Sequence, residues 1–131
     1  PFLLINEASL EDLNKRILAQ GKDPVTIDRF RPSILVQGAP AYAEDYWRKI
    51  RINGIEFSIV KPCSRCVITT INQQTIAKGK EPLQTLSTYR RTPQGKVMFG
   101  QNLIHNQIGI IHVGNSVEVL EQVDHPNFEL K

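Results

Sequence analysis

Hydrophobic residues recur at helical spacing in two stretches of the chain. In NEASLEDLNKRILAQG, residues 6–21, four apolar residues have the spacing that places side chains on one face of an α-helix: Leu10, Leu13, Ile17 and Leu18. Ser9 is the expected N-cap of this helix and Gly21 its expected stop. In EPLQTLSTYR, residues 81–90, Pro82 stands where a first helical turn tolerates proline. The spacing therefore predicts two helices.

Most of the remaining apolar runs are short and β-branched. The dipeptide Asn53-Gly54 is preferred in two-residue hairpin turns, and apolar and polar residues alternate through residues 55–59. Further runs predict strands at residues 2–5, 33–38, 66–71, 96–104, 108–114 and 116–123. Residues 41–50 fit a loop or one helical turn. Strands that do not alternate with helices favour a mainly β fold, a barrel with a few peripheral helices.

Length and charge narrow the function classes. The chain has 131 residues, which fits one domain, with residues 124–131 as a polar tail or linker. It begins in an apolar run without Met, so we expect a piece of a longer protein. The net charge of +3 suits a local anion site better than a nucleic-acid surface. With no apolar run near the ~20 residues of a membrane span and no signal peptide, a cytoplasmic protein that binds neither membrane nor nucleic acid is expected.

Both cysteines lie in one CxxC, Cys63 and Cys66. Zinc needs four ligands, and only three histidines, far apart in the sequence, are available to complete the set. Thioredoxin-type chemistry needs a helix N-terminus, whereas the residues after Cys66 favour a strand. A single thiolate next to Arg65 is a third interpretation, because a guanidinium favours the ionised thiol. Taken alone, the motif fits two buried, packed cysteines best.

The paired arginines support two interpretations. Arg29 and Arg31 flank Phe30, and a guanidinium fork suits the oxygens of an anion such as phosphate. From the residues alone an ordinary solvated pair is favoured there, and likewise at Arg90-Arg91. The three histidines fit structural or surface positions better than ligand positions. No phosphate-binding loop, dinucleotide fingerprint or nucleophile elbow occurs.

Several motifs together resemble the MOSC domain, the C-terminal domain of molybdenum cofactor sulfurases. The likeness is greatest to the branch that contains the mitochondrial amidoxime reducing component and bacterial proteins that detoxify N-hydroxylated bases. The motifs appear in the family's order as NEASLEDLN, FRPSILVQG, YAEDYW, CSRCVITT, KEPLQTLSTYR, FGQ and VGNSV. This resemblance runs through nearly the whole chain and implies a MOSC-type β-barrel.

The resemblance also implies a molybdenum site. By position, Cys66 is the thiolate ligand of molybdenum in a pyranopterin cofactor, and four residues contact the cofactor: Arg31, Ser33, Ser64 and Arg65. Soft thiolates suit such a metal. The implied activity is reduction of N-hydroxylated compounds, with electrons from a ferredoxin-like [2Fe–2S] domain or a flavoprotein reductase. The family's N-terminal barrel domain, which supplies further cofactor contacts, is absent from this sequence, so we expect the isolated chain to lack cofactor.

Two positions depart from the family's pattern. Ser33 replaces an asparagine, which shortens one cofactor contact, and Asn115 replaces an aspartate, which removes a charge at the rim of the site. The resemblance also leaves an alternative role, that of a sulfur carrier. In that role Cys66 would hold a persulfide delivered by a pyridoxal-phosphate-dependent desulfurase.

Overall fold

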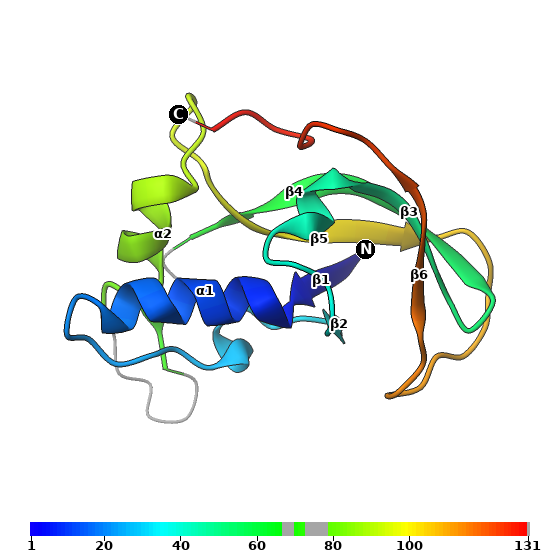
Figure 1. Ribbon diagram of the computed structural model, residues 1–131, viewed down its shortest axis with the longest axis horizontal. Helices are drawn as coiled ribbons and strands as arrows, with labels where there is room; N and C mark the ends of the chain where they lie inside the picture. The colour runs from blue at the N-terminus through cyan, green and yellow to red at the C-terminus, as the bar shows by residue number, and fades with distance from the viewer. Residues whose placement is uncertain (67–69, 73–78, 131) are drawn as a thin grey trace.

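One curled six-stranded sheet forms the body of the protein (Figure 1). The computed structural model describes residues 1–66, 70–72 and 79–130. The strands are β1 (Phe2–Asn6), β2 (Ile34–Val36), β3 (Trp47–Ile52), β4 (Ile55–Arg65), β5 (Val97–His105) and β6 (Val117–Gln122). Their order is β2-β1-β5-β4-β3-β6, in which β1 and β2 are parallel and the other neighbours are antiparallel.

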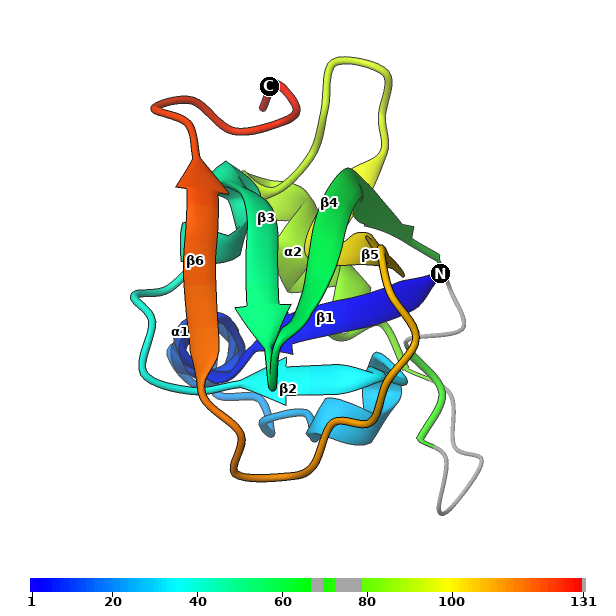
Figure 2. The ribbon, with the colours of Figure 1, turned by 90° about the vertical axis from the view of Figure 1, so that its right-hand side faces the viewer.

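The sheet bends into a half-barrel, since β1 and β2 cross beneath β3, β4 and β6 (Figure 2). The two helices, α1 (Glu7–Leu18) and α2 (Leu83–Tyr89), lie together on one side (Figure 1). The predicted mainly β class with a few peripheral helices is confirmed. The described residues contain six strands rather than the seven or eight expected, and none of their helices is long and apolar enough to cross a membrane.

The hairpin and the first helix follow from local chemistry. Ile52 and Ile55 pair across Asn53-Gly54, and both turn residues have positive φ, +49° and +76°, as this turn requires. Helix α1 lies where the spacing predicts it, but Ser9 is not its N-cap. Asn6 caps the helix by accepting a 3.1 Å hydrogen bond from the Ala8 amide.

Two hydrophobic cores lie on opposite faces of the sheet. Leu4, Phe57 and Leu103 belong to the core inside the half-barrel, while Ile5 and Phe99 belong to the core under α1 and α2. Consecutive residues of β1 therefore enter different cores, because side chains alternate along a strand. This burial on both faces explains the uninterrupted apolar run at the start of the chain.

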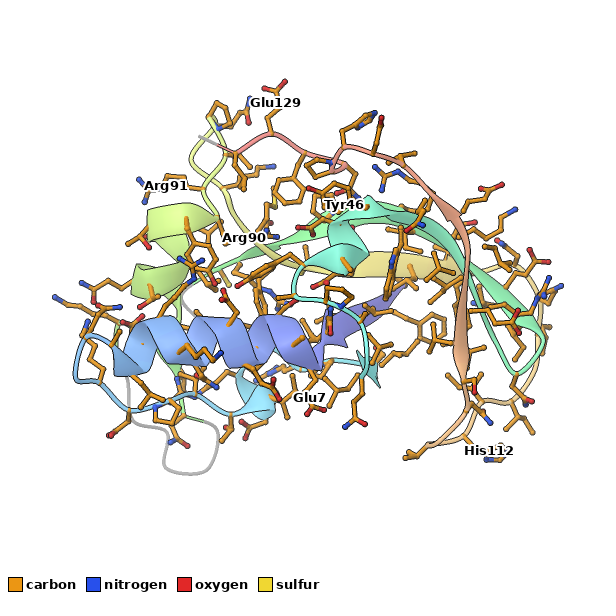
Figure 3. All side chains as sticks on the ribbon, viewed as in Figure 1. Glu7, Tyr46, Arg90, Arg91, His112 and Glu129 are labelled. Carbon is orange, nitrogen blue, oxygen red and sulfur yellow. The ribbon has the colours of Figure 1, made fainter. Side chains whose placement is uncertain are left out.

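A buried polar cluster links the sheet to the segment after β6. Arg90 and Asp45 form an ion pair at 2.9 Å, with Arg90 4% and Asp45 2% exposed. Gln101 donates to Asp45 at 2.8 Å, and Asn127 donates to Gln101 at 2.8 Å. Figure 3 shows Arg90 turned inward and Arg91 turned outward. The expectation of a solvated Arg90-Arg91 pair is thus wrong for Arg90.

Of the expected strands, one does not form and another lies largely outside the described residues. Residues 108–114 are irregular and exposed, not a strand. Asn53 donates to the Ile110 carbonyl at 2.8 Å and the Glu56 amide donates to Gln107 at 2.7 Å, so side chains fasten this segment to the hairpin. The strand expected at residues 66–71 lies largely outside the described residues. Cys66 follows β4 directly, so the strand that presents this cysteine precedes it.

Candidate functional site

The cysteine motif lies at the end of β4, where the pairing with β5 is irregular. Ser64 pairs with Met98 and Arg65 with Val97, but the register shifts twice before them, between Ile59 and Lys61 and between Pro62 and Ser64. Pro62 has no amide hydrogen to donate, which accounts for a break in the ladder at this point. Irregular pairing of this kind redirects side chains and is frequent beside functional sites.

The two thiols differ in environment. Cys63 is half-buried and Cys66 is exposed, and neither described cysteine is in a disulfide. The Cys63 thiol donates a weak hydrogen bond to the Ser64 carbonyl oxygen, with 3.7 Å between sulfur and oxygen. Because Cys66 is exposed, the interpretation of two buried, packed cysteines fails for the second thiol.

The structure gives no support to a zinc site. Among the described residues no three Cys, His, Asp or Glu side chains gather at a metal-binding distance. All three histidines, His105, His112 and His125, are exposed. His112 lies at the tip of the β5–β6 connection, at the far end of the molecule from Arg90 (Figure 3). The histidines therefore occupy surface positions, as the sequence favours.

Arg65 joins three segments of the chain. Its Nε donates to the Phe99 carbonyl on β5 at 2.8 Å, and its Nη1 donates to the Phe30 carbonyl at 3.2 Å. The guanidinium carbon lies 5.1 Å from the centre of the Phe30 ring, within cation–π range. Phe30 ends the short helix η1 (Ile27–Arg29), so Arg65 ties this turn to the end of β4.

Arg65 has no acidic partner among the residues that the structure describes. Within the described part of the chain no carboxylate forms an ion pair with Arg65, and its buried Nη2 has no hydrogen-bond acceptor. Burial lowers the pKa of Arg65, because desolvation disfavours the cation, whereas the nearby Cys63 and Cys66 oppose this shift. An arginine remains charged even so.

The other predicted site residues lie on the two segments that Arg65 connects. Arg31 and Ser33 follow η1, and Ser64 precedes Arg65 on β4; all three are exposed. Ser33 is held against β1, since its amide donates to the Leu3 carbonyl at 2.9 Å and its hydroxyl accepts from the Leu3 amide at 3.2 Å. Arg31 has a φ of +52°, the left-handed region that is unfavourable for a side chain with Cβ. Arg29 ends η1, and Arg31 lies beyond it in this left-handed turn.

Sequence reasoning missed the part played by Phe30, Phe99 and Gly100. The rings of Phe30 and Phe99 pack with centroids 4.7 Å apart beside the guanidinium of Arg65. A Cβ built on Gly100 would lie 3.1 Å from Arg65 Nη2 and 2.6 Å from Ile5 Cδ1, so glycine leaves the space that the guanidinium fills. The FGQ motif carried the signal, but its reason is visible only when β4 and β5 are paired.

Comparison with known proteins agrees with this fold and with the motifs. The MOSC domain family matches residues 1–118. The chain belongs to the MOSC domain family. Human mitochondrial amidoxime-reducing component 1 is 41% identical over 130 residues, which cover 93% of this chain and 37% of that protein. The zebrafish protein of the same name is 42% identical over 121 residues, covering 89% of this chain and 36% of that protein.

A second group of relatives carries a different name. The molybdenum cofactor sulfurase of rice is 40% identical over 114 residues, covering 82% of this chain and 14% of that protein. This chain thus spans little more than a third of the amidoxime-reducing components and a smaller share of the sulfurase. These relatives of the domain include further sequence outside the part that matches.

The relatives correct one expectation and leave others without support. The expected cytoplasmic location is wrong, because the names of the amidoxime-reducing relatives in human, mouse and cattle place those proteins in mitochondria. The human, zebrafish and rice relatives are animal and plant proteins, which gives no support to a bacterial source. Nothing in their names bears on pyridoxal phosphate.

Proposed function

We propose that this MOSC domain holds a molybdenum-pyranopterin cofactor through the Cys66 thiolate, in a reductase of N-hydroxylated compounds. One observation carries the proposal: an exposed thiol directly follows an arginine that is largely buried without a carboxylate partner among the described residues. A cation in that position favours the thiolate form of a nearby cysteine. Thiolates are the soft donors that such a metal centre takes.

The residues around Cys66 fit an anionic cofactor. Ser64, Arg31 and Ser33 have exposed side chains that offer hydroxyl and guanidinium donors. Arg31 is the residue best suited to a phosphate, because guanidinium binds such oxygens in a bidentate manner. Arg65 contributes positive charge beneath the site. When bound, the cofactor supplies two-electron redox chemistry, and the role of this chain is to hold and orient it.

Matched cysteine variants test the metal assignment. Cys66→Ser is expected to lose bound molybdenum and reductase activity, while Cys63→Ser, three residues earlier on the same motif, is expected to retain both. Metal content by plasma mass spectrometry, on protein carrying whatever further domains the native polypeptide has, gives the answer. Retention of molybdenum by Cys66→Ser and its loss from Cys63→Ser would show that the ligand has been assigned to the wrong thiol.

A second candidate function is a sulfur carrier, which the similarity to the rice molybdenum cofactor sulfurase favours. Cys66 would then hold a persulfide delivered by a pyridoxal-phosphate-dependent partner, since its thiol is exposed. Intact-mass measurement of native protein would show one added sulfur that is absent from Cys66→Ser. A bound pterin without that added mass supports the reductase instead.

The proposed reductase needs partners that this chain does not supply. The longer relatives include sequence beyond the MOSC match, which supports a neighbouring barrel domain that completes the cofactor cradle. Electrons would come from a ferredoxin-like [2Fe–2S] domain or a flavoprotein reductase. On this basis the isolated 131-residue chain is expected to purify without cofactor.

A further inference from the structure

The guanidinium of Arg65 is directed into the protein rather than toward solvent. Two of its nitrogens already donate to the Phe99 and Phe30 carbonyls, at 2.8 Å and 3.2 Å. The third, Nη2, is buried and lies where a Cβ at Gly100 would come within 3.1 Å of it. A side chain enclosed in this way is a poor candidate for a direct contact with a large ligand.

The segment that Arg65 holds contains a strained residue. Phe30 accepts the Arg65 bond through its carbonyl, and the next residue, Arg31, has a φ of +52°. The left-handed conformation is unfavourable for a residue with Cβ, because Cβ comes too close to the following carbonyl oxygen. Such conformations persist only where the surroundings over-determine them, and they gather at functional sites.

Other contacts also hold this turn. The Phe30 amide donates to the Ile27 carbonyl at 3.0 Å, and Arg29 Nη1 donates to the Glu81 carbonyl at 3.3 Å. The Arg31 amide donates to the Asp28 carbonyl at 3.3 Å, and the Ser33 amide donates to the Leu3 carbonyl at 2.9 Å. Hydrogen bonds from a charged donor are stronger than those between neutral groups. The Arg65 bond comes from a charged donor, and it acts on the carbonyl of the peptide group that Phe30 shares with Arg31.

We propose that Arg65 is a positioning residue, which fastens the Phe30 carbonyl to β5 and thereby keeps Arg31 in its left-handed conformation beside the end of β4 that bears Cys66. The importance of this arrangement for a cofactor rests on the proposed function. The structural coupling between Arg65 and Arg31 does not rest on it, and this coupling can be measured on the native polypeptide without cofactor.

Amide hydrogen exchange measured by NMR tests the coupling. In Arg65→Met the Ser33 amide is expected to exchange about tenfold faster, since a tenfold change corresponds to ~1.4 kcal/mol, close to the lower end for one hydrogen bond from a charged group. Arg65→Lys, which keeps the charge but reaches one carbonyl at a time, is expected to fall between Arg65→Met and the wild type. This milder variant keeps the test usable should Arg65→Met fold poorly.

Rescue at Arg31 separates positioning from simple packing. Glycine adopts a positive φ without strain, so Arg65→Met/Arg31→Gly is expected to return Ser33 exchange to within about threefold of the wild-type rate. If Arg65 merely filled space, the cavity would remain in the double variant and the faster exchange would persist.

Arg90→Lys is the matched control, because Arg90 is also a buried arginine whose Nε donates to a β5 carbonyl, that of Met98, at 2.9 Å. It is expected to lower stability without selectively accelerating exchange at Ser33. Unchanged Ser33 exchange in Arg65→Met would overturn the proposal, and so would failure of the glycine rescue. It would also be overturned if Arg90→Lys, at a stability equal to that of Arg65→Met, accelerated Ser33 exchange by the same factor. None of these readouts involves molybdenum, so they remain valid should Cys66 prove not to be a metal ligand.

Discussion

The Asp45–Arg90 pair permits a quantitative prediction about stability. Both residues are at most 4% exposed, and Arg90 also donates to the Met98 carbonyl and lies over the Tyr42 ring at 4.6 Å. Arg90→Met keeps much of the side-chain volume but leaves the Asp45 carboxylate buried without its cation. Removing one partner of a buried pair costs about 3–5 kcal/mol, so we expect a loss of that size in the free energy of unfolding.

The exposed pair between Arg51 and Glu118 provides the control. Its atoms lie 3.5 Å apart, and the side chains are 39% and 62% exposed. Arg51→Met should therefore cost less than about 1 kcal/mol, because solvent screens exposed pairs. Urea unfolding measures both losses on one scale, provided that the free energy of unfolding falls with urea concentration at the same slope in both variants. Equal losses in Arg90→Met and Arg51→Met would refute the claim that the buried charge at Asp45 dominates.

A double variant identifies the origin of the loss. If the cost of Arg90→Met comes mainly from the isolated carboxylate, then Asp45→Asn/Arg90→Met should be more stable than Arg90→Met alone by at least about 1 kcal/mol. A double variant that is less stable than Arg90→Met would instead assign the cost to the lost packing of Arg90 on Tyr42 and to the Met98 bond.

Two further predictions concern Gly100 and Glu44. Gly100→Ala should lower the free energy of unfolding by about 2–4 kcal/mol, because Gly100 has a φ of +87° and an added Cβ would lie 2.6 Å from Ile5. Gly38→Ala, with a φ of +91° but open space around it, should lower it by only about 1–2 kcal/mol. Thermal melts compare the two variants, and equal losses would contradict the packing argument. Burial raises the pKa of Glu44 above its ordinary 4.5, so the folded protein binds this proton more tightly than the unfolded chain. The tighter binding stabilises the folded state fully below pH 4.5, and this stabilisation is lost as the pH rises through the folded pKa. The stability of Glu44→Gln relative to the wild type should therefore increase as the pH is raised from about 4 to 7. Urea midpoints of the two proteins that keep a constant difference over this range would argue against the prediction.

The features that sequence reasoning predicted correctly are those whose cause is local. Asn53-Gly54 determines its own turn, and the spacing of Leu13 and Ile17 determines which face of α1 is buried. Leu18, at the end of the same pattern, is 54% exposed, so the expectation is wrong for this residue. Ser9 shows the limit of this approach. It has the right chemistry for an N-cap, yet it is buried and donates to Glu44, 35 residues away, at 2.8 Å. A competing long-range partner of this kind has no signature in the local sequence.

At the candidate site, too, sequence reasoning identifies the residues with recognisable chemistry but not their distant partners. The CSRC motif and the family resemblance identify Cys66 and Arg65 as residues of interest, because their chemistry can be recognised from residue types alone. The partners of Arg65 could not be identified in advance, since they are backbone carbonyls at Phe30 and Phe99 that any residue would supply. The buried state of Arg90 is equally invisible, because its acid, Asp45, is distant in sequence.

Three consecutive residues of β5 connect the exposed thiol region with the buried polar cluster. Phe99 accepts the Arg65 bond through its carbonyl, Gly100 leaves room for the guanidinium, and Gln101 donates to Asp45 from a fully buried position. The FGQ motif is thus a framework that fixes two arginine-containing clusters relative to each other. Loss of activity in a Gln101 variant would therefore not by itself identify a catalytic residue, because the change acts on β5 and, through Phe99 and Gly100, on Arg65.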